Sequence, residues 1–441
     1  MIFGTDGVRG VVDKELNAEL AYNIGKGMAI NLINKNNIRK VIIGKDTRLS
    51  GDTYLSAVAS GLCDYGIDVV IVGIVPTPVI SFLVSKLDFG GGVMITASHN
   101  DYTYNGIKVF SDCGEKINKQ DEIDIESNIK SDFNKTKFKG KITYDESLVQ
   151  KYIEYILTAF NCDFSNLTIA IDSANGSNYS LAPYIYEKLN ANVIKVCCNN
   201  DGLNINKDCG ANHIENLTQV VTSTNADFGM SFDGDGDRLR IVLSDGRVIS
   251  GDDILLYLAL YLKEKNRLSN LTVVGTIMTN MGVEDAFNVH GITMLRTDVG
   301  DKNVIQLMKE KNLSIGGESS GHICIYEHNP TCDALLNSIF FLKCYNENLI
   351  NLEQLMLTIN KYPSITQNIN VDKEFRKDFD NNLSVKSAIN ILENNNKDCR
   401  FVVRPSGTEP VIRIYVEGKS EIKNKEMMEK VIEIIKKAEL D

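Results

Sequence analysis

Apolar residues occur in short blocks that alternate with polar loops and amphipathic stretches. The segment KVIIGKDTRLSGDTYLSAVASGLCDYGIDVVIVG has an apolar strand, a polar loop, an amphipathic helix ending at Gly66 and a second apolar strand. The same order begins again at Leu167 and at Leu271. Such β-loop-α-β units, of about 30 residues each, build mostly parallel sheets that helices cover. The pattern predicts three similar α/β domains, with one large sheet as the alternative.

The last part of the chain has a different pattern. ITQNINVDKEF alternates apolar and polar residues and is predicted as a strand, followed by a helix over 385–392 and the strands RFVV and VIRIYVEG. The final segment places Met428, Val431, Ile432 and Ile435 at helical spacing. We therefore expect α/β domains at residues 1–145, 146–250 and 251–362 and a smaller α+β domain at 363–441.

Composition narrows the classes of function. Of the 441 residues, 43% are hydrophobic and 24% are charged, which is typical of a globular chain with several cores. The net charge of −11 disfavours nucleic-acid or membrane binding, and no stretch approaches the roughly 20 apolar residues of a membrane span. The N-terminus has no signal-peptide pattern, and ten cysteines without C-x-x-C spacing indicate reduced thiols. We expect a cytoplasmic protein.

The segment DGDGDR lies between two predicted strands. Asp233, Asp235 and Asp237 stand at alternate positions, and the glycines between them let the backbone curl and direct three carboxylates to one point. Hard anionic oxygens suit Mg²⁺. An EF-hand is excluded because Arg238 and Ser244 stand where that loop needs Gly and an acid. The spacing predicts a magnesium site, and a solvated Asp-Gly turn is the alternative.

A serine follows the apolar strand GGVMI in the segment TASHN. Ser98, beside His99, is a candidate nucleophile or phosphorylated residue, although a helix N-cap or turn serine is the common alternative. The flanking glycines of a hydrolase nucleophile elbow are absent. Lys108 falls on the next predicted strand, where its charge would balance a phosphate, although an ordinary surface lysine is the common alternative.

Three loops carry groups suited to phosphate or to the hydroxyls of a sugar. GGESSGH offers Glu318 and Ser320 to sugar hydroxyls, and FGTDGVRG places Arg9 beside a Gly-rich turn. RPSGTEP concentrates phosphate donors, with a plain Pro-Gly turn as the alternative. Its candidate residues, together with an arginine on the following strand, are Arg404, Ser406, Gly407, Thr408 and Arg413.

Five of these segments, in this order, resemble the α-D-phosphohexomutase family: FGTDGVRG, TASHN, DGDGDR, the G-E-x-S-G-H loop and RPSGTEP. They span nearly the whole chain, and their order is more specific than any one of them. Within the family, NINKDCGANHIENL and LRTDVGDKNV are most similar to segments of bacterial phosphoglucosamine mutases.

The resemblance implies a fold and a set of site residues. It implies three similar α/β domains with mixed sheets around a central cleft, which carry the phosphoserine, the metal and the sugar site in turn, and a smaller phosphate-binding α+β domain. Ser98 would be phosphorylated and would bind Mg²⁺ together with Asp233, Asp235 and Asp237. The implied residues around the transferring phosphoryl group are Arg9, His99, Lys108 and Arg238. The implied substrate-binding residues are Glu318, Ser320, His322, Arg404, Ser406, Gly407, Thr408 and Arg413.

The implied activity is a phosphosugar mutase. It would move a phosphoryl group between O6 and O1 of glucosamine phosphate through phosphoserine and a hexosamine 1,6-bisphosphate, on the route to UDP-N-acetylglucosamine, in a monomer or a homodimer. Asp101 replaces the customary Pro, Ser319 the customary Gln, and HNPTCDA at Cys332 a segment that usually carries Thr-Gly-Asp. A phosphoglucomutase or phosphomannomutase is therefore the alternative. A silent sugar-phosphate binder is disfavoured by Ser98 and the three aspartates.

Overall fold

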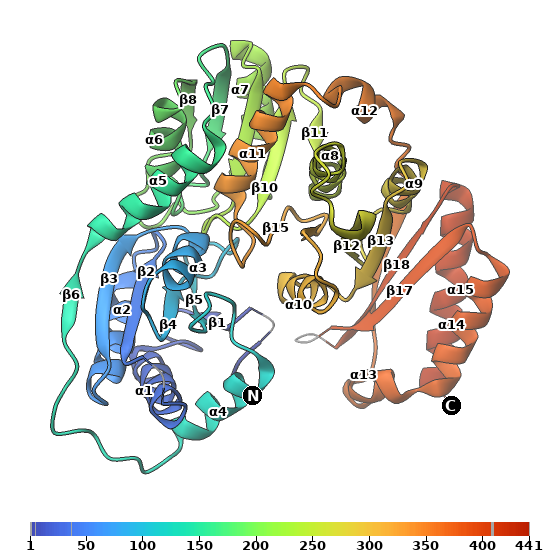
Figure 1. The fold of residues 1–441 in the computed structure, drawn as a ribbon. Coiled ribbons are helices and arrows are strands. Elements are labelled where there is room, and N and C mark those ends of the chain that lie inside the picture. Colours follow the sequence, from blue (N-terminus) through green and yellow to red (C-terminus); the bar gives the residue numbers. More distant parts are fainter. Residues whose placement is uncertain (1, 5, 37, 407–409, 441) are drawn as a thin grey trace. The chain divides into compact units, whose positions relative to one another are not determined.

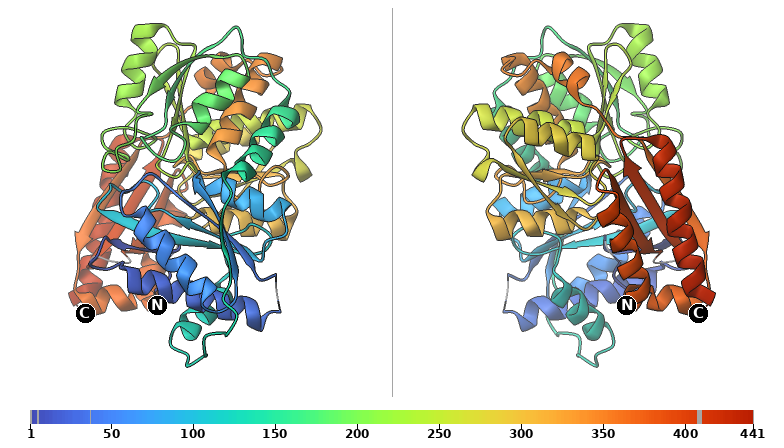
Figure 2. Two further views of the ribbon diagram at one scale, coloured as in Figure 1. Left: turned by 90° about the vertical axis from the view of Figure 1, so that its left-hand side faces the viewer. Right: turned by 90° about the vertical axis from the view of Figure 1, so that its right-hand side faces the viewer.

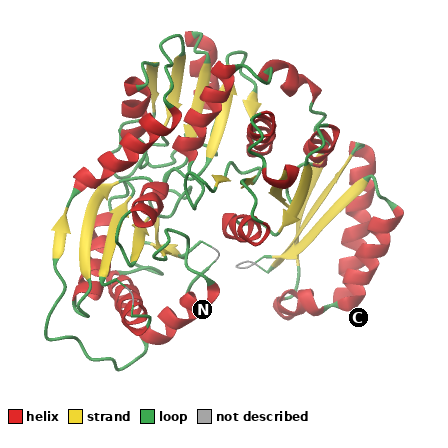
Figure 3. Cartoon of the chain, viewed as in Figure 1, coloured by secondary structure: helices red, strands yellow, loops and turns green. Residues whose placement is uncertain are grey.

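The computed structural model of the chain describes residues 2–4, 6–36, 38–406 and 410–440. It consists of two compact units, the first formed by residues 1–276 and 297–352 and the second by residues 277–296 and 353–441. Strands gather into sheets that helices flank (Figure 1, Figure 3). In the described part of the chain, no helix combines the length and the apolar character needed to cross a bilayer.

The first sheet of the first unit has the order β1-β5-β4-β2-β3-β6. Its central strands run parallel, whereas β1 and β5 are antiparallel to their neighbours, so the sheet is mixed. The strands are β1 (Val8–Val11), β2 (Lys40–Lys45), β3 (Asp68–Ile74), β4 (Gly91–Ile95), β5 (Tyr104–Phe110) and β6 (Ile142–Tyr144). The accompanying helices are α1 (Ala18–Asn34), α2 (Gly51–Cys63), α3 (Thr77–Lys86) and α4 (Lys119–Ile129).

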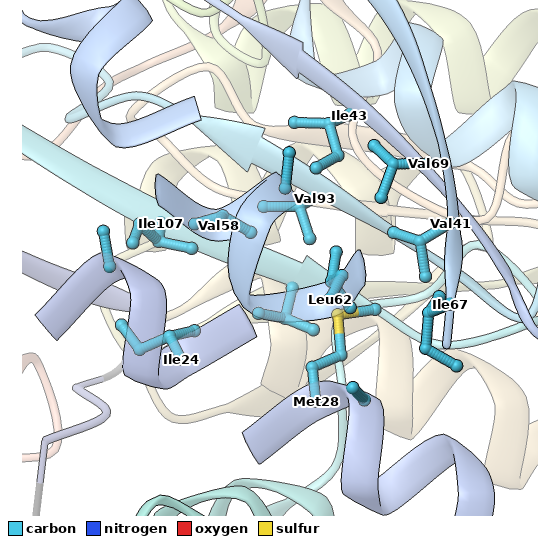
Figure 4. Close-up of a cluster of buried hydrophobic side chains, with 14 of the residues drawn as sticks. Ile24, Met28, Val41, Ile43, Val58, Leu62, Ile67, Val69, Val93 and Ile107 are labelled. Atoms are coloured by element: carbon cyan, nitrogen blue, oxygen red, sulfur yellow. The ribbon is translucent and has the colours of Figure 1, made fainter. Parts of the chain in front are cut away.

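Apolar side chains from α1, α2 and this sheet form a buried core (Figure 4). Met28 and Leu62 point from the two helices toward Val41 and Val93 of the sheet. Glycines let α1 and α2 approach closely, since a Cβ atom on Gly61 would lie 2.1 Å from a backbone oxygen of α1. The core thereby fixes the sheet whose strand ends carry the candidate site.

The second sheet has the order β11-β10-β9-β7-β8. Parallel pairing of β7 with β8 and β9 continues into an antiparallel edge of β10 and β11. The strands are β7 (Thr168–Asp172), β8 (Asn192–Val196), β9 (Phe228–Phe232), β10 (Leu239–Leu243) and β11 (Val248–Ile249). The accompanying helices are the 3₁₀ turn η1 (Glu146–Leu148), α5 (Val149–Phe160), α6 (Leu181–Lys188) and α7 (Glu215–Thr224).

A third group of strands completes the first unit. Strand β12 (Thr272–Thr276) pairs in parallel with β14 (Ile315–Gly317), which pairs antiparallel with β15 (Ile323–Ile325). The helices are α8 (Gly251–Glu264), the 3₁₀ turn η2 (Ser269–Leu271), α10 (Asp301–Lys311) and α11 (Ala334–Glu347). Residues 251–262 of α8 are all buried, and from Ile254 to Leu262 the helix has apolar or aromatic side chains on every face.

The second unit contains an antiparallel sheet of order β16-β18-β17. Helices α14 and α15 lie side by side along one face of it (Figure 1, Figure 2). The strands are β16 (Ser364–Asn370), β17 (Cys399–Pro405) and β18 (Val411–Gly418), with β13 (Thr293–Thr297) also in this unit. The helices are α9 (Met281–Val289), α12 (Leu352–Thr358), α13 (Lys373–Asp378), η3 (Phe379–Asn381), α14 (Leu383–Asn395) and α15 (Glu421–Leu440).

Most elements agree with the sequence pattern. The predicted strand-helix-strand order occurs in β2-α2-β3, β7-α6-β8 and β12-α9-β13, and α15 buries Met428, Val431 and Ile435. One prediction is wrong: the strand predicted over ITQNINVDKEF stops at Asn370. Asp372 accepts a hydrogen bond of 2.7 Å from the backbone N–H of Glu374 and caps α13, which ends the extended conformation.

Candidate active site

The DGDGDR segment forms a tight turn between β9 and β10. Oxygens of Asp233, Asp235 and Asp237 lie within 4.8 Å of one another, and all three side chains are buried. Asp233 Oδ1 lies 3.2 Å from each of the backbone nitrogens of residues 236, 237 and 238, which donate to it. Gly236 has a φ of 75°, which a glycine adopts without strain. The predicted convergence of the three carboxylates is present.

The charge on these carboxylates fits a divalent cation. Burial, together with the neighbouring carboxylates of Asp237 and Asp235, raises the pKa of Asp233 to about 7. Asp235 Oδ1 is buried and has no hydrogen-bond partner among the described residues. Three buried carboxylate oxygens with an unpaired acceptor among them are the ligands that Mg²⁺ prefers. The residues therefore fit the magnesium ion that the sequence predicted.

Lys108, on β5, neutralises part of this charge. Its ammonium lies 2.8 Å from Asp235 Oδ2, 3.0 Å from Asp237 Oδ2 and 3.0 Å from Asp6 Oδ2. Burial alone would lower the pKa of Lys108, but the three carboxylates raise it well above its ordinary value. Burial would likewise raise the pKa of Asp237, yet Lys108 and His322 hold it well below its usual range. Lys108 is therefore a permanent cation in contact with the cluster.

Ser98 lies on the turn that follows β4 and is in contact with the carboxylates. Its hydroxyl donates a hydrogen bond of 2.8 Å to Asp233 Oδ2, and the side chain is buried. Its φ of 51° is unusual for a residue with a side chain, and such strain concentrates at functional sites. The backbone N–H of Ser98 donates to Thr96 Oγ1 at 2.9 Å. The structure thus brings together two segments that only the family resemblance had related in the sequence analysis.

Arg48, which the sequence analysis did not identify, stabilises this turn through hydrogen bonds to its backbone. Its fully buried guanidinium donates to the carbonyl oxygens of Ser98 at 2.9 Å and Asn100 at 2.8 Å, and to that of Asp101. Nε pairs with Asp46 Oδ2 at 2.9 Å. Its position after β2, in the loop KDTR, is the same strand-end position as that of Ser98, and this was the available signal.

A second support comes from the loop between β8 and α7. Asn206 Nδ2 donates to the carbonyl oxygens of Ser98 and Asn100, both at 2.8 Å. The residue belongs to NINKDCGANHIENL, which entered the sequence analysis only through its family resemblance. The turn that carries Ser98 is therefore held from two sides by side-chain donors.

Near the N-terminus, Arg9 lies beside the same turn. Its guanidinium donates to Asn100 Oδ1 at 3.0 Å and to Asp6 Oδ2 at 3.1 Å. Asp6 Oδ1 also accepts from the Lys116 ammonium at 2.5 Å, and Lys116 pairs with Asp301 at 2.7 Å. Asp6 and Lys116 were not predicted: Asp6 belongs to FGTDGVRG, from which only Arg9 was selected, and Lys116 is an isolated charged residue without a motif.

The GGESSGH segment connects β14 to β15. Glu318 is buried, accepts from the Gly300 N–H at 2.9 Å and lies 2.9 Å from His322 Nδ1. The other ring nitrogen of His322 lies 3.0 Å from Asp237 and 3.2 Å from Arg238 Nε. Burial opposes protonation of His322, but Asp237 and Glu318 raise its pKa to about 10. The GGESSGH loop and the carboxylate cluster are therefore connected through a cationic histidine.

Two more predicted residues lie in this region. Ser320 Oγ is 3.5 Å from His322 Nδ1. His99 has a pKa lowered to about 4 by burial and by the Arg238 and Arg9 charges, so its ring is neutral at pH 7. Its Nδ1 is buried without a hydrogen-bond partner in the described part of the chain. A neutral ring nitrogen can accept or donate one hydrogen bond to a ligand.

The remaining predicted residues belong to the second unit. Arg404 on β17 and Arg413 on β18 stand directly opposite each other in the antiparallel ladder. Arg413 Nη2 lies 3.5 Å from Ser406 Oγ, and Arg376 Nη1 donates to the Ser406 carbonyl at 2.6 Å. The predicted residues Gly407 and Thr408 lie outside the described residues. Three of the predicted phosphate donors therefore lie close together on this unit.

Comparison with known proteins gives the family of the chain. Models of the phosphoglucomutase/phosphomannomutase α/β/α domains I, II and III match residues 1–136, 150–246 and 250–362. The model of the C-terminal domain of the same family matches residues 368–434. Together these models cover most of the chain, in the order in which its sheets occur.

Full-length relatives are phosphoglucosamine mutases. That of Alkaliphilus oremlandii is 38% identical over 427 residues, or 95% of each chain. That of Caldicellulosiruptor bescii is 40% identical over 425 residues, 95% of this chain and 94% of its own.

Among solved structures, a phosphoglucomutase/phosphomannomutase family protein from Burkholderia thailandensis has a TM-score of 0.84 at 23% identity, covering 99% of this chain and 97% of its own. An N-acetylphosphoglucosamine mutase of Aspergillus fumigatus, solved with GlcNAc-6P and magnesium, has a TM-score of 0.68 at 16% identity, covering 100% and 96%. At these identities the likeness supports the fold of three α/β/α domains and a C-terminal domain.

Proposed function

Because the chain belongs to the phosphohexomutase family, a group of phosphosugar isomerases, we propose that it interconverts glucosamine 6-phosphate and glucosamine 1-phosphate. Phosphoglucosamine mutases that are 36–40% identical over nearly the full length support this substrate. The observation that carries the proposal is the 2.8 Å contact between Ser98 Oγ and Asp233, inside a carboxylate cluster that Lys108 partly neutralises.

In the proposed reaction, phosphoserine 98 transfers its phosphoryl group to the free O1 or O6 hydroxyl of the sugar. The P–O bond to Ser98 breaks as the bond to the sugar oxygen forms, which gives a hexosamine 1,6-bisphosphate and a free serine. The bisphosphate then turns over and returns its other phosphoryl group to Ser98. Phosphoryl transfer of this kind depends on positioning and on stabilisation of charge, so a rigid support for Ser98 is needed.

Several side chains would act on the transferring group. The permanent charges of Lys108, Arg238 and Arg9 would stabilise the equatorial oxygens. Neutral His99 has an unpaired ring nitrogen among the described residues that would accept a hydrogen bond from the attacking hydroxyl. Asp233, Asp235 and Asp237 would hold Mg²⁺ together with the phosphoserine, and the ion would neutralise charge on the phosphoryl group.

Substrate recognition would come from two places in the chain. Glu318, oriented by Gly300 and His322, would accept hydrogen bonds from sugar hydroxyls, and Ser320 would add a second polar group. Arg404, Ser406, Gly407, Thr408 and Arg413 would bind the phosphate that does not react. Since the bisphosphate must turn over, this phosphate site would accept either end of the same sugar.

The proposal is tested by side-by-side assays on glucosamine, glucose and mannose 6-phosphates. We expect turnover of the glucosamine compound, and a preference of more than about tenfold for glucose or mannose phosphate, or roughly 1.4 kcal/mol, would refute the glucosamine assignment. Ser98→Ala should abolish turnover, whereas Ser56→Ala, on the exposed face of α2, should not. Intact mass should show one phosphatase-sensitive phosphoryl group on the active protein and none on Ser98→Ala. Full activity of Ser98→Ala would overturn the phosphoserine mechanism.

A further inference from the structure

A second cluster of reactive side chains lies apart from the carboxylates. Asp172 ends β7, Cys197 follows β8, and Cys209 lies in the loop before α7. Their ligand atoms, two sulfurs and a carboxylate oxygen, all lie within 4.8 Å of one another. Cys209 is buried and Cys197 is partly exposed, so reagents in solution have access to one sulfur of the pair. The proposed mutase mechanism uses none of these residues.

The backbone holds the two cysteines in place. Cys197 has a φ of 46°, and its carbonyl oxygen accepts a hydrogen bond of 2.6 Å from the Asn175 N–H. The next residue of Cys209, Gly210, donates its N–H to Asp172 Oδ2 at 2.8 Å. The backbone beside each cysteine is therefore held by a contact to the end of β7 or to the turn after it, although 12 positions separate the two cysteines in the sequence.

The surroundings of the sulfurs favour a thiolate at Cys197. Asn216 Nδ2 donates to Cys197 Sγ at 3.6 Å, and Asn175 Nδ2 donates to Cys209 Sγ at 3.8 Å. A hydrogen bond from the Cys209 thiol lowers the pKa of Cys197, and the same contact raises that of Cys209. The thiolate is the reactive form of cysteine, so the lower pKa makes Cys197 the more reactive thiol of the pair.

A metal fits this cluster less well. Both oxygens of Asp172 already accept backbone N–H groups at 2.8 Å, from Ala174 and Gly210. The amide groups that face the sulfurs present N–H donors, which a cation would repel. A closed zinc site has four protein ligands, and the cluster supplies three among the described residues.

We propose that Cys197 and Cys209 are a modification site that forms a reversible disulfide on exposure to a peroxide. The Cys197 thiolate attacks one peroxide oxygen, the O–O bond breaks, and with one proton the first water leaves, which gives a sulfenic acid. Cys209 attacks this sulfur, the S–O bond breaks, and its thiol proton leaves with the hydroxide as the second water. Two thiols are oxidised and one peroxide is reduced to two waters.

The disulfide would restrain the loop that supports Ser98. It would close residues 198–208 into a ring, and this segment contains Asn206, which holds the carbonyls of Ser98 and Asn100. The carbonyl oxygen of Gly202 in the same loop accepts a hydrogen bond of 3.0 Å from the Leu49 N–H. Oxidation would therefore reduce the motion of the segment that links this cluster to the candidate active site.

The test is a mass measurement that does not depend on mutase activity. The protein is used with Cys113→Ser, which removes the exposed thiol, and is treated with hydrogen peroxide. We expect a loss of about 2 Da that dithiothreitol reverses, and a non-reduced peptide that joins residues 197 and 209. Cys197→Ser and Cys209→Ala should each prevent the bridge. Cys198→Ser is the matched control and should not, because the Cys198 thiol donates to the Val196 carbonyl at 3.2 Å.

Other outcomes would overturn the proposal. Addition of oxygen without a cross-link, a bridge through Cys198, or zinc retained by the purified protein and released by Cys197→Ser would each do so. Hydrogen exchange tests the effect on the loop: amides of residues 198–208 should exchange more slowly after oxidation in the Cys113→Ser protein and not in Cys197→Ser. Unchanged exchange in a fully bridged protein would refute the restraint.

Discussion

Arg48 offers the sharpest test of how the fold positions Ser98. The Arg48–Asp46 pair is completely buried, with side-chain exposures of 0% for both residues. Arg48→Met leaves the Asp46 carboxylate buried without its counter-ion, which costs about 3–5 kcal/mol in comparable cases. It also removes the donors to the carbonyls of Ser98, Asn100 and Asp101. A displacement of the reacting group by about 1 Å lowers turnover roughly 100-fold.

We therefore expect Arg48→Met to lower the free energy of unfolding by about 3–5 kcal/mol and kcat by about 100-fold or more. The double variant Asp46→Asn/Arg48→Met separates the two effects. Removing the orphaned charge should recover part of the stability, whereas kcat should stay low because the turn still lacks its donors. Urea unfolding and the mutase assay measure both quantities, and Arg48→Lys, which keeps the charge, replaces Arg48→Met if the latter does not fold.

Arg247→Met is the matched control. Arg247 pairs with Asp245 at 2.6 Å on the surface, and an exposed pair of this kind contributes up to about 1 kcal/mol. Arg247→Met should lower the free energy of unfolding by no more than about 1 kcal/mol, and its kcat should stay at the wild-type value. Wild-type kcat in phosphorylated Arg48→Met, or full recovery of kcat in the double variant, would show that Arg48 does not position Ser98.

Three further predictions concern the metal, the sugar and pH. Asp235→Asn should lower kcat about 100-fold or more, with partial rescue by added Mg²⁺, and wild-type activity in excess chelator would contradict the metal site. Ser319→Gln should sharpen the preference for glucosamine over glucose phosphate about threefold to tenfold in kcat/KM, since a regained hydrogen bond contributes about 0.5–1.5 kcal/mol. Burial raises the pKa of Asp333 to about 6, so the folded protein binds this proton more tightly than the unfolded chain. Its stability should fall by about 2.5 kcal/mol relative to Asp333→Asn as pH rises from 4 to 7, and a pH-independent difference in urea unfolding would refute this.

Features set by neighbouring residues were predictable from the sequence. The β-loop-α-β order follows from the period of the apolar positions, and the three aspartates converge because one short turn contains them all. Ser98 was found because it directly follows a buried strand. Two local signals can also predict different structures for the same segment. Apolar alternation continues to Val371 and favours a strand, whereas the side chain of Asp372 accepts from the N–H of Glu374 and caps a helix. The strand ends at Asn370 and α13 begins at Lys373, so the cap prevails.

Contacts between distant parts of the chain could not be predicted in this way. Arg48 and Asn206 meet the carbonyl of Ser98 from positions 50 and 108 residues away, and no periodicity relates them. From the sequence alone, Arg48 and Asn206 would be predicted at the surface, since most arginines and asparagines are exposed. Only the crossing of β2, β4 and the β8–α7 loop at one place makes them donors to a buried turn.

The same distinction explains why the chemistry of Lys108 was harder to predict than that of the aspartates. A lysine on a strand is solvent-exposed by default, and its role depends on which acids the fold brings to it. Here Asp6, Asp235 and Asp237 come from two distant segments, and their carboxylates make burial of the ammonium favourable. Removing any one of these acids therefore changes the environment of Lys108, and through it that of the proposed phosphoryl site at Ser98. The three aspartates of the site can be found in one short segment of the sequence. The balance of charge around them depends on Asp6 and Lys108, which the fold of the first unit brings to them.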